Sequence, residues 1–268
     1  MLRDITLGQY YPAQSILHRL DPRVKLCGTL VYIISLFIFQ SFTGYIVATL
    51  FLASMIFISK VPVSFIFKGL KAIVVLLVFT GVLNMFFTPG RELVSFWKLT
   101  ITIEGVRTAA FMVVRLIYLI IGSSLLTLTT TPSNLTDALE KSLSWMKIFK
   151  VPVHEIAMMM SIALSFIPIL LQETDKIMKA QQARGADFES GSIIRRAKSL
   201  IPLLVPLFVS SFRRANELAM AMEARCYRGG EGRTKMRPLK YSANDFMAYA
   251  VLVLYLIAIV AVGRLWII

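Results

Sequence analysis

The stretch Ala109-Ala-Phe-Met-Val-Val-Arg-Leu-Ile-Tyr-Leu-Ile-Ile-Gly-Ser-Ser-Leu-Leu-Thr-Leu-Thr129 decides the fold class of this chain. It holds one charged residue, Arg115, in a run that matches the roughly 20 residues a helix needs to cross a bilayer core. Four more apolar runs accompany it, at residues 24–40, 45–58, 72–88 and 246–262. With 57% hydrophobic and 16% charged residues, the 268-residue chain has too few charges to cover a soluble domain. The sequence therefore predicts an all-α integral membrane protein with about five transmembrane helices.

The placement of the basic residues predicts an orientation in the bilayer. The formal net charge is +14, and 24 of the 29 Lys and Arg lie at or before the start of the first span, between the second and third, or between Thr131 and the last. The one sizeable loop on the other side holds Arg91, Lys98 and Arg107. This asymmetry follows the positive-inside rule and places the N-terminus in the cytoplasm. No basic stripe interleaved with aromatic residues accompanies the charge, so the lipid bilayer and not nucleic acid is the expected partner.

Residue types that carry catalysis or bind metals are scattered along the chain. Cys27 and Cys226 lie far apart, and His18 and His154 are likewise isolated, so neither a disulfide framework nor metal-ligand spacing is present. The glycine-rich segment after Tyr227 has no Gly-Lys-Ser/Thr following a strand and is not a P-loop. We therefore predict no catalytic residues, no metal and no cofactor, and the chain is not expected to be an enzyme.

The composition changes in the region that precedes the last span. Between Asn134 and Asp245 the chain carries 11 of its 15 acidic and 17 of its 29 basic residues, and its apolar runs are shorter than a bilayer. The predicted organisation is residues 1–131 for about four N-terminal transmembrane helices, 132–244 for a cytoplasmic helical module, and 245–268 for a C-terminal transmembrane helix. Within the module we expect a first helix to about Phe149, a second over 153–184 bent at Pro168, and a third over 192–225 broken by two prolines.

Two helix ends in this module are alike. Ala180-Gln-Gln-Ala183-Arg184-Gly185 ends the second helix, and Ala221-Met-Glu-Ala224-Arg225-Cys226 ends the third. An arginine at a helix C-terminus interacts favourably with the helix dipole, which alone explains many such residues. Its planar guanidinium also binds a carboxylate with two hydrogen bonds, which suits docking into a partner. The repeated context favours docking, while simple helix capping remains the alternative.

Three motifs resemble one family, the transmembrane T component of energy-coupling factor transporters. They are Leu20-Asp21-Pro22-Arg23-Val24-Lys25-Leu26, Ala183-Arg184-Gly185-Ala186-Asp187-Phe188 and Ala224-Arg225-Cys226-Tyr227. The resemblance runs over essentially the whole chain. It implies a multi-pass protein of a bacterial-type plasma membrane, whose module holds two long, proline-bent coupling helices that cross on the cytoplasmic side.

The resemblance also implies a function and a set of partners. The family's arginine tips are thought to dock in grooves of two ABC-type ATPase subunits, which hydrolyse ATP. A membrane-embedded substrate-binding S component takes up vitamins or other micronutrients. Carried over by motif, the ATPase-docking residues are Ala183, Arg184, Gly185, Ala224, Arg225 and Cys226. Where this chain has Cys226 the family usually has glycine, which makes a left-handed helix cap less favourable at the second tip.

Methionine is flexible and polarizable, so a methionine-rich surface can accept partners of different shape. A possible contact surface for an S component comprises Met158, Met159, Met160, Met178, Met220 and Met222. For any one of them, ordinary core or lipid-facing packing is the simpler interpretation.

The alternative function is a stand-alone secondary transporter with its own substrate path. The interiors of the predicted spans contain no Asp or Glu, and no inverted repeat is evident, although proton or sodium coupling commonly uses both. The sequence therefore favours a coupling subunit.

Overall fold

The computed structural model describes residues 10–38, 42–71, 73–96, 99–186, 188, 192, 194, 198–230, 236 and 238–265. The chain forms two compact units. The bundle unit comprises Gly8–Ala138 and Leu239–Ile268, and the arm unit is built on Leu139–Pro238.

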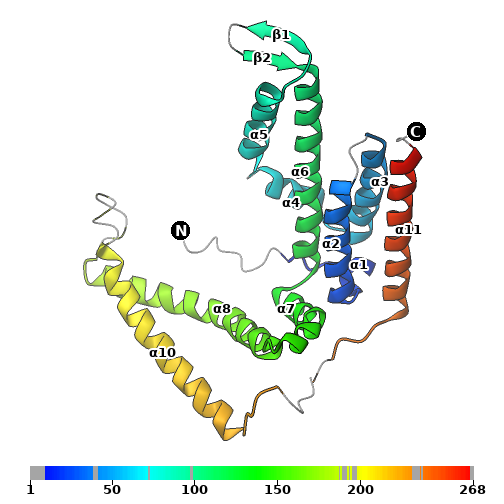
Figure 1. Ribbon diagram of the computed structural model, residues 1–268. Helices are drawn as coiled ribbons and strands as arrows, with labels where there is room; N and C mark the ends of the chain where they lie inside the picture. Colours follow the sequence, from blue (N-terminus) through cyan, green and yellow to red (C-terminus); the bar gives the residue numbers. More distant parts are fainter. Residues whose placement is uncertain are drawn as a thin grey trace. The chain divides into compact units, whose positions relative to one another are not determined.

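The bundle unit is helical apart from one small hairpin (Figure 1). Its helices are α1 (Ile16–Arg19), α2 (Pro22–Ile38), α3 (Phe42–Ser59), α4 (Val63–Lys71), α5 (Val74–Phe87), α6 (Ile103–Thr129), most of α7 (Pro132–Ser142) and α11 (Ala243–Leu265). The hairpin pairs β1 (Glu92–Phe96) with β2 (Leu99–Thr102) in antiparallel register.

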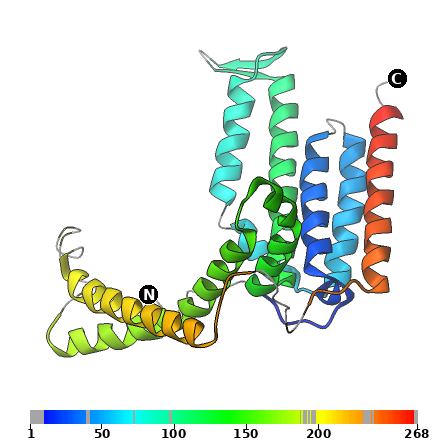
Figure 2. The same cartoon turned by 60° about the horizontal axis from the view of Figure 1, so that its bottom comes forward.

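Helices α2, α3, α6 and α11 pack side by side, as Figure 2 shows. Their shared core consists of buried side chains from α2, α3 and α11, namely Tyr32, Leu36, Tyr45, Ala48, Leu52, Tyr255 and Ile259. Inside it the hydroxyls of Ser35 and Tyr255 lie 2.8 Å apart and share a hydrogen bond. Helix α6 approaches α2 closely at Gly122, where a Cβ atom would lie 2.6 Å from Cε1 of Tyr32. Glycine is therefore required there by the ring packed against it.

Several described helices are long and apolar enough to cross a membrane. By length and composition they are α3, α6, α8 (Val153–Ala183) and α11, and α4 with α5 makes up to five if this pair, bent by 58°, counts as one span. Helix α2, with 17 residues, covers most of the predicted run at 24–40. The prediction of an all-α membrane protein is confirmed. Helix α8 is long and apolar enough to cross a membrane, although the sequence placed it in the predicted cytoplasmic module. Its assignment to that module stays a prediction.

The region between the third and fourth predicted spans differs from expectation. Helix α6 begins at Ile103 and not at Ala109, because the side chain of Thr102 caps it by accepting a 3.0 Å hydrogen bond from the N–H of Gly105. Arg107 consequently lies in α6 and not in a loop. The hairpin of β1 and β2 was not predicted, because its strands are too short for a clear alternating pattern.

The arm unit contains a 3₁₀ helix, η2 (Ser144–Phe149), and the helices α8 and α10 (Ile201–Ala224). The predicted first helix to Phe149 is thus two elements, α7 and then η2. Pro168 lies inside α8, at the position where a bend was predicted. Pro206 lies inside α10, which continues through it, so the break predicted at this proline is wrong. Pro202 does not break α10 but occupies its first turn, where a missing N–H leaves no helical hydrogen bond unmade.

Candidate functional site

The first basic tip is the C-terminus of α8. Its end is a Schellman motif, in which the N–H of Ala186 donates to the carbonyl of Gln181 at 3.0 Å and the N–H of Gly185 donates to that of Gln182 at 2.9 Å. Gly185 has φ +86°, the left-handed conformation that this motif requires. Arg184 is the capping residue between the helix and this turn. The local sequence therefore ends the helix abruptly and leaves Arg184 at its last turn.

The second basic tip, at the C-terminus of α10, has the same backbone design. The N–H of Tyr227 donates to the carbonyl of Met222 at 3.0 Å, and that of Cys226 donates to Glu223 at 2.8 Å. Arg225 is the capping residue, with φ −92° and ψ 14° against −88° and 9° at Arg184. Cys226 adopts φ +52° although it is not glycine, which costs about 1 kcal/mol or slightly more. The departure from glycine has therefore not changed the geometry of the cap.

The arginine side chains at both tips are free to bind. Arg184 and Arg225 are exposed, and neither guanidinium makes a hydrogen bond or ion pair with any residue that the structure describes. The flanking Ala183 and Ala224 are exposed as well and keep each tip narrow. Each guanidinium thus stands at a helix end with all its donors available to an external carboxylate.

The two tips lie at opposite ends of an antiparallel helix pair within the arm unit (Figure 1). Near the first tip, Nε2 of Gln181 donates to the carbonyl of Pro202 at 3.5 Å. Further along, Arg214 of α10 and Glu173 of α8 form an ion pair at 3.7 Å, with the side chains 34% and 25% exposed. These contacts join α8 to α10 from the first tip to about the middle of α10.

The methionines predicted as a contact surface do not all lie together. Met158 of α8 and Met222 of α10 line one hollow of about 510 Å³ with residues 225–229, next to the second tip. Met159, Met160 and Met220 are exposed outside this hollow, and Met178 is half-buried on α8.

A larger apolar surface lies on α10. Leu204, Val205, Phe208 and Phe212 are each more than half exposed, and the rings of Phe208 and Phe212 pack at a centroid distance of 4.7 Å. This face was not predicted as a site from the sequence. The recurrence of apolar residues at spacings of three or four was the available signal.

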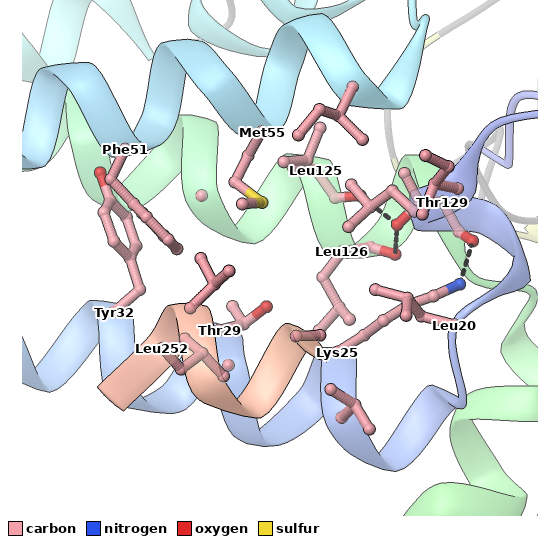
Figure 3. A pocket seen from close by; sticks show the side chains of 18 of the residues that line it. Leu20, Lys25, Thr29, Tyr32, Phe51, Met55, Leu125, Leu126, Thr129 and Leu252 are labelled. Carbon is pink, nitrogen blue, oxygen red and sulfur yellow. Dashed lines mark hydrogen bonds between the residues drawn. The ribbon is translucent and has the colours of Figure 1, made fainter. Parts of the chain in front are cut away.

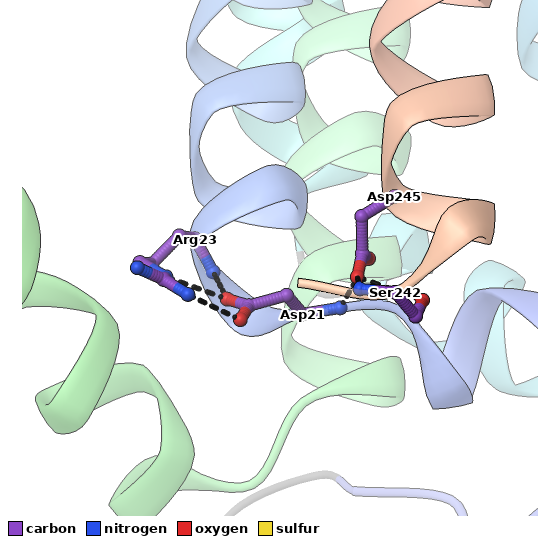
Figure 4. Close-up of polar contacts among 4 residues, drawn as sticks. All are labelled: Asp21, Arg23, Ser242 and Asp245. Atoms are coloured by element: carbon purple, nitrogen blue, oxygen red, sulfur yellow. Dashed lines mark hydrogen bonds and ion pairs between the residues drawn. The ribbon is translucent and has the colours of Figure 1, made fainter. Parts of the chain in front are cut away.

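The Leu20-to-Leu26 motif contacts the start of α11 at the start of α2, and we call this contact between Asp21, Arg23, Ser242 and Asp245 the latch (Figure 4). Oδ1 of Asp245 accepts a 2.7 Å hydrogen bond from the N–H of Asp21, and its Oδ2 accepts from the N–H and the hydroxyl of Ser242 at 2.7 and 2.9 Å. Arg23 grips the Asp21 carboxylate with two bonds of 2.8 and 3.0 Å and covers the ring of Tyr241 at 3.9 Å. The Ser-x-x-Asp spacing before an apolar run, a helix-start signature, was the sequence signal for this latch.

Close to the latch, Lys25 and His18 hold the short helix α1. Nζ of Lys25 donates to the carbonyls of His18 and Thr129 at 3.0 and 2.9 Å. The His18 ring contacts the hydroxyl of Ser15 at 2.7 Å and the carbonyl of Tyr11 at 3.0 Å. Burial lowers the pKa of His18 below its usual 6.5, because burial disfavours the charged imidazolium. The ring is therefore neutral, and its two nitrogens make hydrogen bonds to Ser15 and Tyr11.

A cavity of about 350 Å³ lies within the bundle unit between α2, α3, α6 and α11. Figure 3 shows Lys25 at one end and Tyr32 and Phe51 at the other. Most of its lining is aliphatic, and no Asp or Glu is among the lining residues. Such a space does not suit a polar substrate or an ion that binds to a carboxylate. The cavity therefore gives no support to the alternative of a secondary transporter. In the part of the chain that the structure describes, no group of three or more His, Cys, Asp or Glu is placed to hold a metal.

The apolar helices define a multi-pass membrane protein, and comparison with known proteins assigns it to a family. The family profile described as CbiQ, cobalt transport protein, matches residues 13–236. The chain is 57% identical over 268 residues to the energy-coupling factor transporter transmembrane protein EcfT of Clostridium kluyveri, covering 99% of both chains. It is 54% identical to EcfT of Ruminiclostridium cellulolyticum over 96% of both chains. It is 41% identical to EcfT of Lactococcus lactis subsp. cremoris over 97% of this chain and 98% of the relative.

The chain therefore belongs to the EcfT family, the transmembrane components of energy-coupling factor transporters. The family resemblance drawn from the three motifs is confirmed. Membership of this family makes the chain a membrane-embedded subunit of a transporter. It does not identify the partners that individual residues bind.

Proposed function

We propose that this chain is the coupling subunit of an importer, which passes ATP-driven motion from two cytoplasmic ABC-type ATPase subunits to a membrane-embedded substrate-binding S component. The cargo class that follows is vitamins or other micronutrients. The observation that carries the proposal is the pair of matching Schellman-capped tips, each with an exposed arginine that has no partner among the described residues.

Two tips of one design suit two copies of one kind of socket. Each cap fixes the backbone on both sides of the arginine, so the guanidinium projects from a rigid end and loses little conformational freedom on binding. A sheltered, charge-assisted hydrogen bond to an arginine contributes about 1.5–3 kcal/mol, which holds a subunit through repeated motion. The exposed alanines beside each arginine leave room for the walls of a groove.

The helix pair offers a path for mechanical transmission. Arg214 and Glu173 tie α10 to α8 between the two tips, and Gln181 ties them near the first tip. A displacement of either tip therefore acts on both helices. The exposed apolar face of α10, with Phe208 and Phe212, is a surface of the kind that packs against another membrane protein. In this proposal the S component packs there, next to the predicted methionine contacts.

The decisive experiment separates the two kinds of partner. The chain is co-expressed with its ATPase subunits and an S component, and purified by a tag as wild type, Arg184→Ala, Arg225→Ala and the double variant. We expect each single variant to weaken ATPase retention by about ten- to 100-fold and the double variant to abolish it together with uptake, while the S component stays bound. Arg213→Ala, which removes an exposed arginine of α10 that pairs with Glu217 on the same helix and lies away from both caps, is the matched control and should change nothing.

The proposal fails if the double variant retains both ATPase subunits and full uptake. A second arm tests the α10 face: Phe208→Ser with Phe212→Ser should release the S component and leave the ATPase subunits attached. Uptake by the purified chain alone, driven by a sodium or proton gradient, would instead establish a secondary transporter.

A further inference from the structure

The turn between α7 and α8 exposes large apolar side chains outside any helix long enough to span a membrane. Within it Trp145 is 58% exposed, Ile148 82% and Phe149 69%. The Trp145 and Phe149 rings pack edge to face at 5.9 Å, so they form one apolar surface. Lys150 closes η2 in the left-handed conformation, with φ +58° and its N–H directed to the carbonyls of Met146 and Lys147. The turn therefore has a defined backbone shape that leaves Trp145, Ile148 and Phe149 exposed.

The same turn is strongly basic. Lys141, Lys147 and Lys150 are all exposed, and no Asp or Glu occurs between Lys141 and Val153. A tryptophan with bulky apolar neighbours, flanked by lysines, is typical of segments at the boundary between lipid headgroups and acyl chains. There the apolar rings enter the acyl region while the lysine stems extend to the phosphates.

Covalent connection keeps the turn close to a membrane-crossing helix. Only residues 130 and 131 separate the end of α6 from α7, and α7 has 11 residues. At 1.5 Å per residue α7 is about 16 Å long, and the two residues before it add at most about 7 Å, so its far end lies within about 24 Å of the end of α6. The turn is therefore within reach of the lipid headgroup layer.

We propose that this turn, residues 141–150, is a membrane anchor that inserts Trp145, Ile148 and Phe149 into the interface of a bilayer containing anionic lipid. The three lysines argue for lipid over a protein partner, because protein interfaces are depleted in lysine whereas anionic headgroups attract it. The anchor would hold the start of α8 at the membrane surface. It is independent of what the arginine tips bind.

The fluorescence of Trp145 tests the anchor in the full-length chain. The sequence has three tryptophans, so Trp97→Phe with Trp266→Phe leaves Trp145 as the sole emitter. The protein is reconstituted into phosphatidylcholine vesicles, with or without phosphatidylglycerol, that contain lipids brominated near the carbonyl end or near the middle of the acyl chain. We expect blue-shifted emission that loses most of its intensity to the shallow bromines, less to the deep ones and little to aqueous acrylamide. Strong acrylamide quenching with no bromine effect would overturn the proposal.

A charge variant tests the lipid chemistry separately. Lys141→Gln, Lys147→Gln and Lys150→Gln in one chain should abolish the extra bromine quenching that phosphatidylglycerol produces in wild type. The matched control changes Lys176, Lys179 and Lys240 to Gln, removing the same charge from exposed positions elsewhere. Equal effects of the two triple variants would refute the electrostatic part of the proposal. If bromines have no effect but Trp145 emission shifts when ATPase or S subunits are added, the turn contacts protein and the anchor is wrong.

Discussion

Replacing Asp245 should destabilise the bundle unit more than replacing any exposed carboxylate. Asp245 is buried, and its carboxylate accepts three hydrogen bonds, one from the N–H of Asp21 and two from Ser242. In Asp245→Ala the groups of Ser242, an exposed residue, turn to water and recover much of their loss. Asp21 is buried, so its N–H cannot turn to water, and leaving this donor without an acceptor costs about 1–3 kcal/mol.

The charge of the accepting carboxylate adds to this loss, so the expected decrease in the free energy of unfolding is about 3 kcal/mol in total. Asp245→Asn keeps one oxygen acceptor and should lose about half as much. The assay is unfolding in mixed micelles by increasing SDS mole fraction, followed by circular dichroism. Asp175→Ala, which removes a carboxylate without a hydrogen bond among the described residues, is the control. Equal SDS midpoints for Asp245→Ala and Asp175→Ala would refute the latch as a stabilising contact.

Three other predictions use the same unfolding assay. Cys226→Gly should stabilise the chain by about 1 kcal/mol, because glycine adopts φ +52° without strain. Cys226→Ala should give no such gain, and equal SDS midpoints for the two variants would count against strain at this cap. Gly122→Ala should destabilise the chain by about 1–3 kcal/mol, because the added Cβ would lie 2.6 Å from the buried Tyr32 ring. Gly69→Ala is the control and should be tolerated, because its nearest neighbour would lie 3.4 Å away. Similar SDS midpoints for the two variants would contradict the close approach of α6 to α2. Burial lowers the pKa of His18, so its contribution to stability is present above pH 6.5 and is lost as the pH falls through the lower folded pKa. His18→Gln should therefore remove that part of the loss of stability in acid. An unchanged dependence of the SDS midpoint on pH would show that protonation of His18 is not coupled to folding.

Composition and hydropathy were enough to predict the class of the fold and most of its helix positions. A span depends on a local run of apolar residues, and a helix end depends on a few adjacent ones, so α3 and α8 could be predicted to within a few residues. Elements with weaker local signals were missed, among them the hairpin of β1 and β2 and the division of one expected helix into α7 and η2. The twin arginine motifs were visible because each lies within six consecutive residues.

The sequence by itself determined that the chain lives in a membrane, belongs to the transporter family whose motifs it carries, and ends two long helices with the same basic tip. Only the tertiary structure decided that Asp21 and Asp245, 224 positions apart, form one latch, and that Cys226 closes its helix as glycine does. The physical reason is range. Hydrophobic runs and helix caps act between near neighbours along the chain, whereas a buried hydrogen bond between distant segments forms only once those segments have come together. The left-handed φ of Cys226 could not be predicted because it runs against the preference of every residue type other than glycine and asparagine.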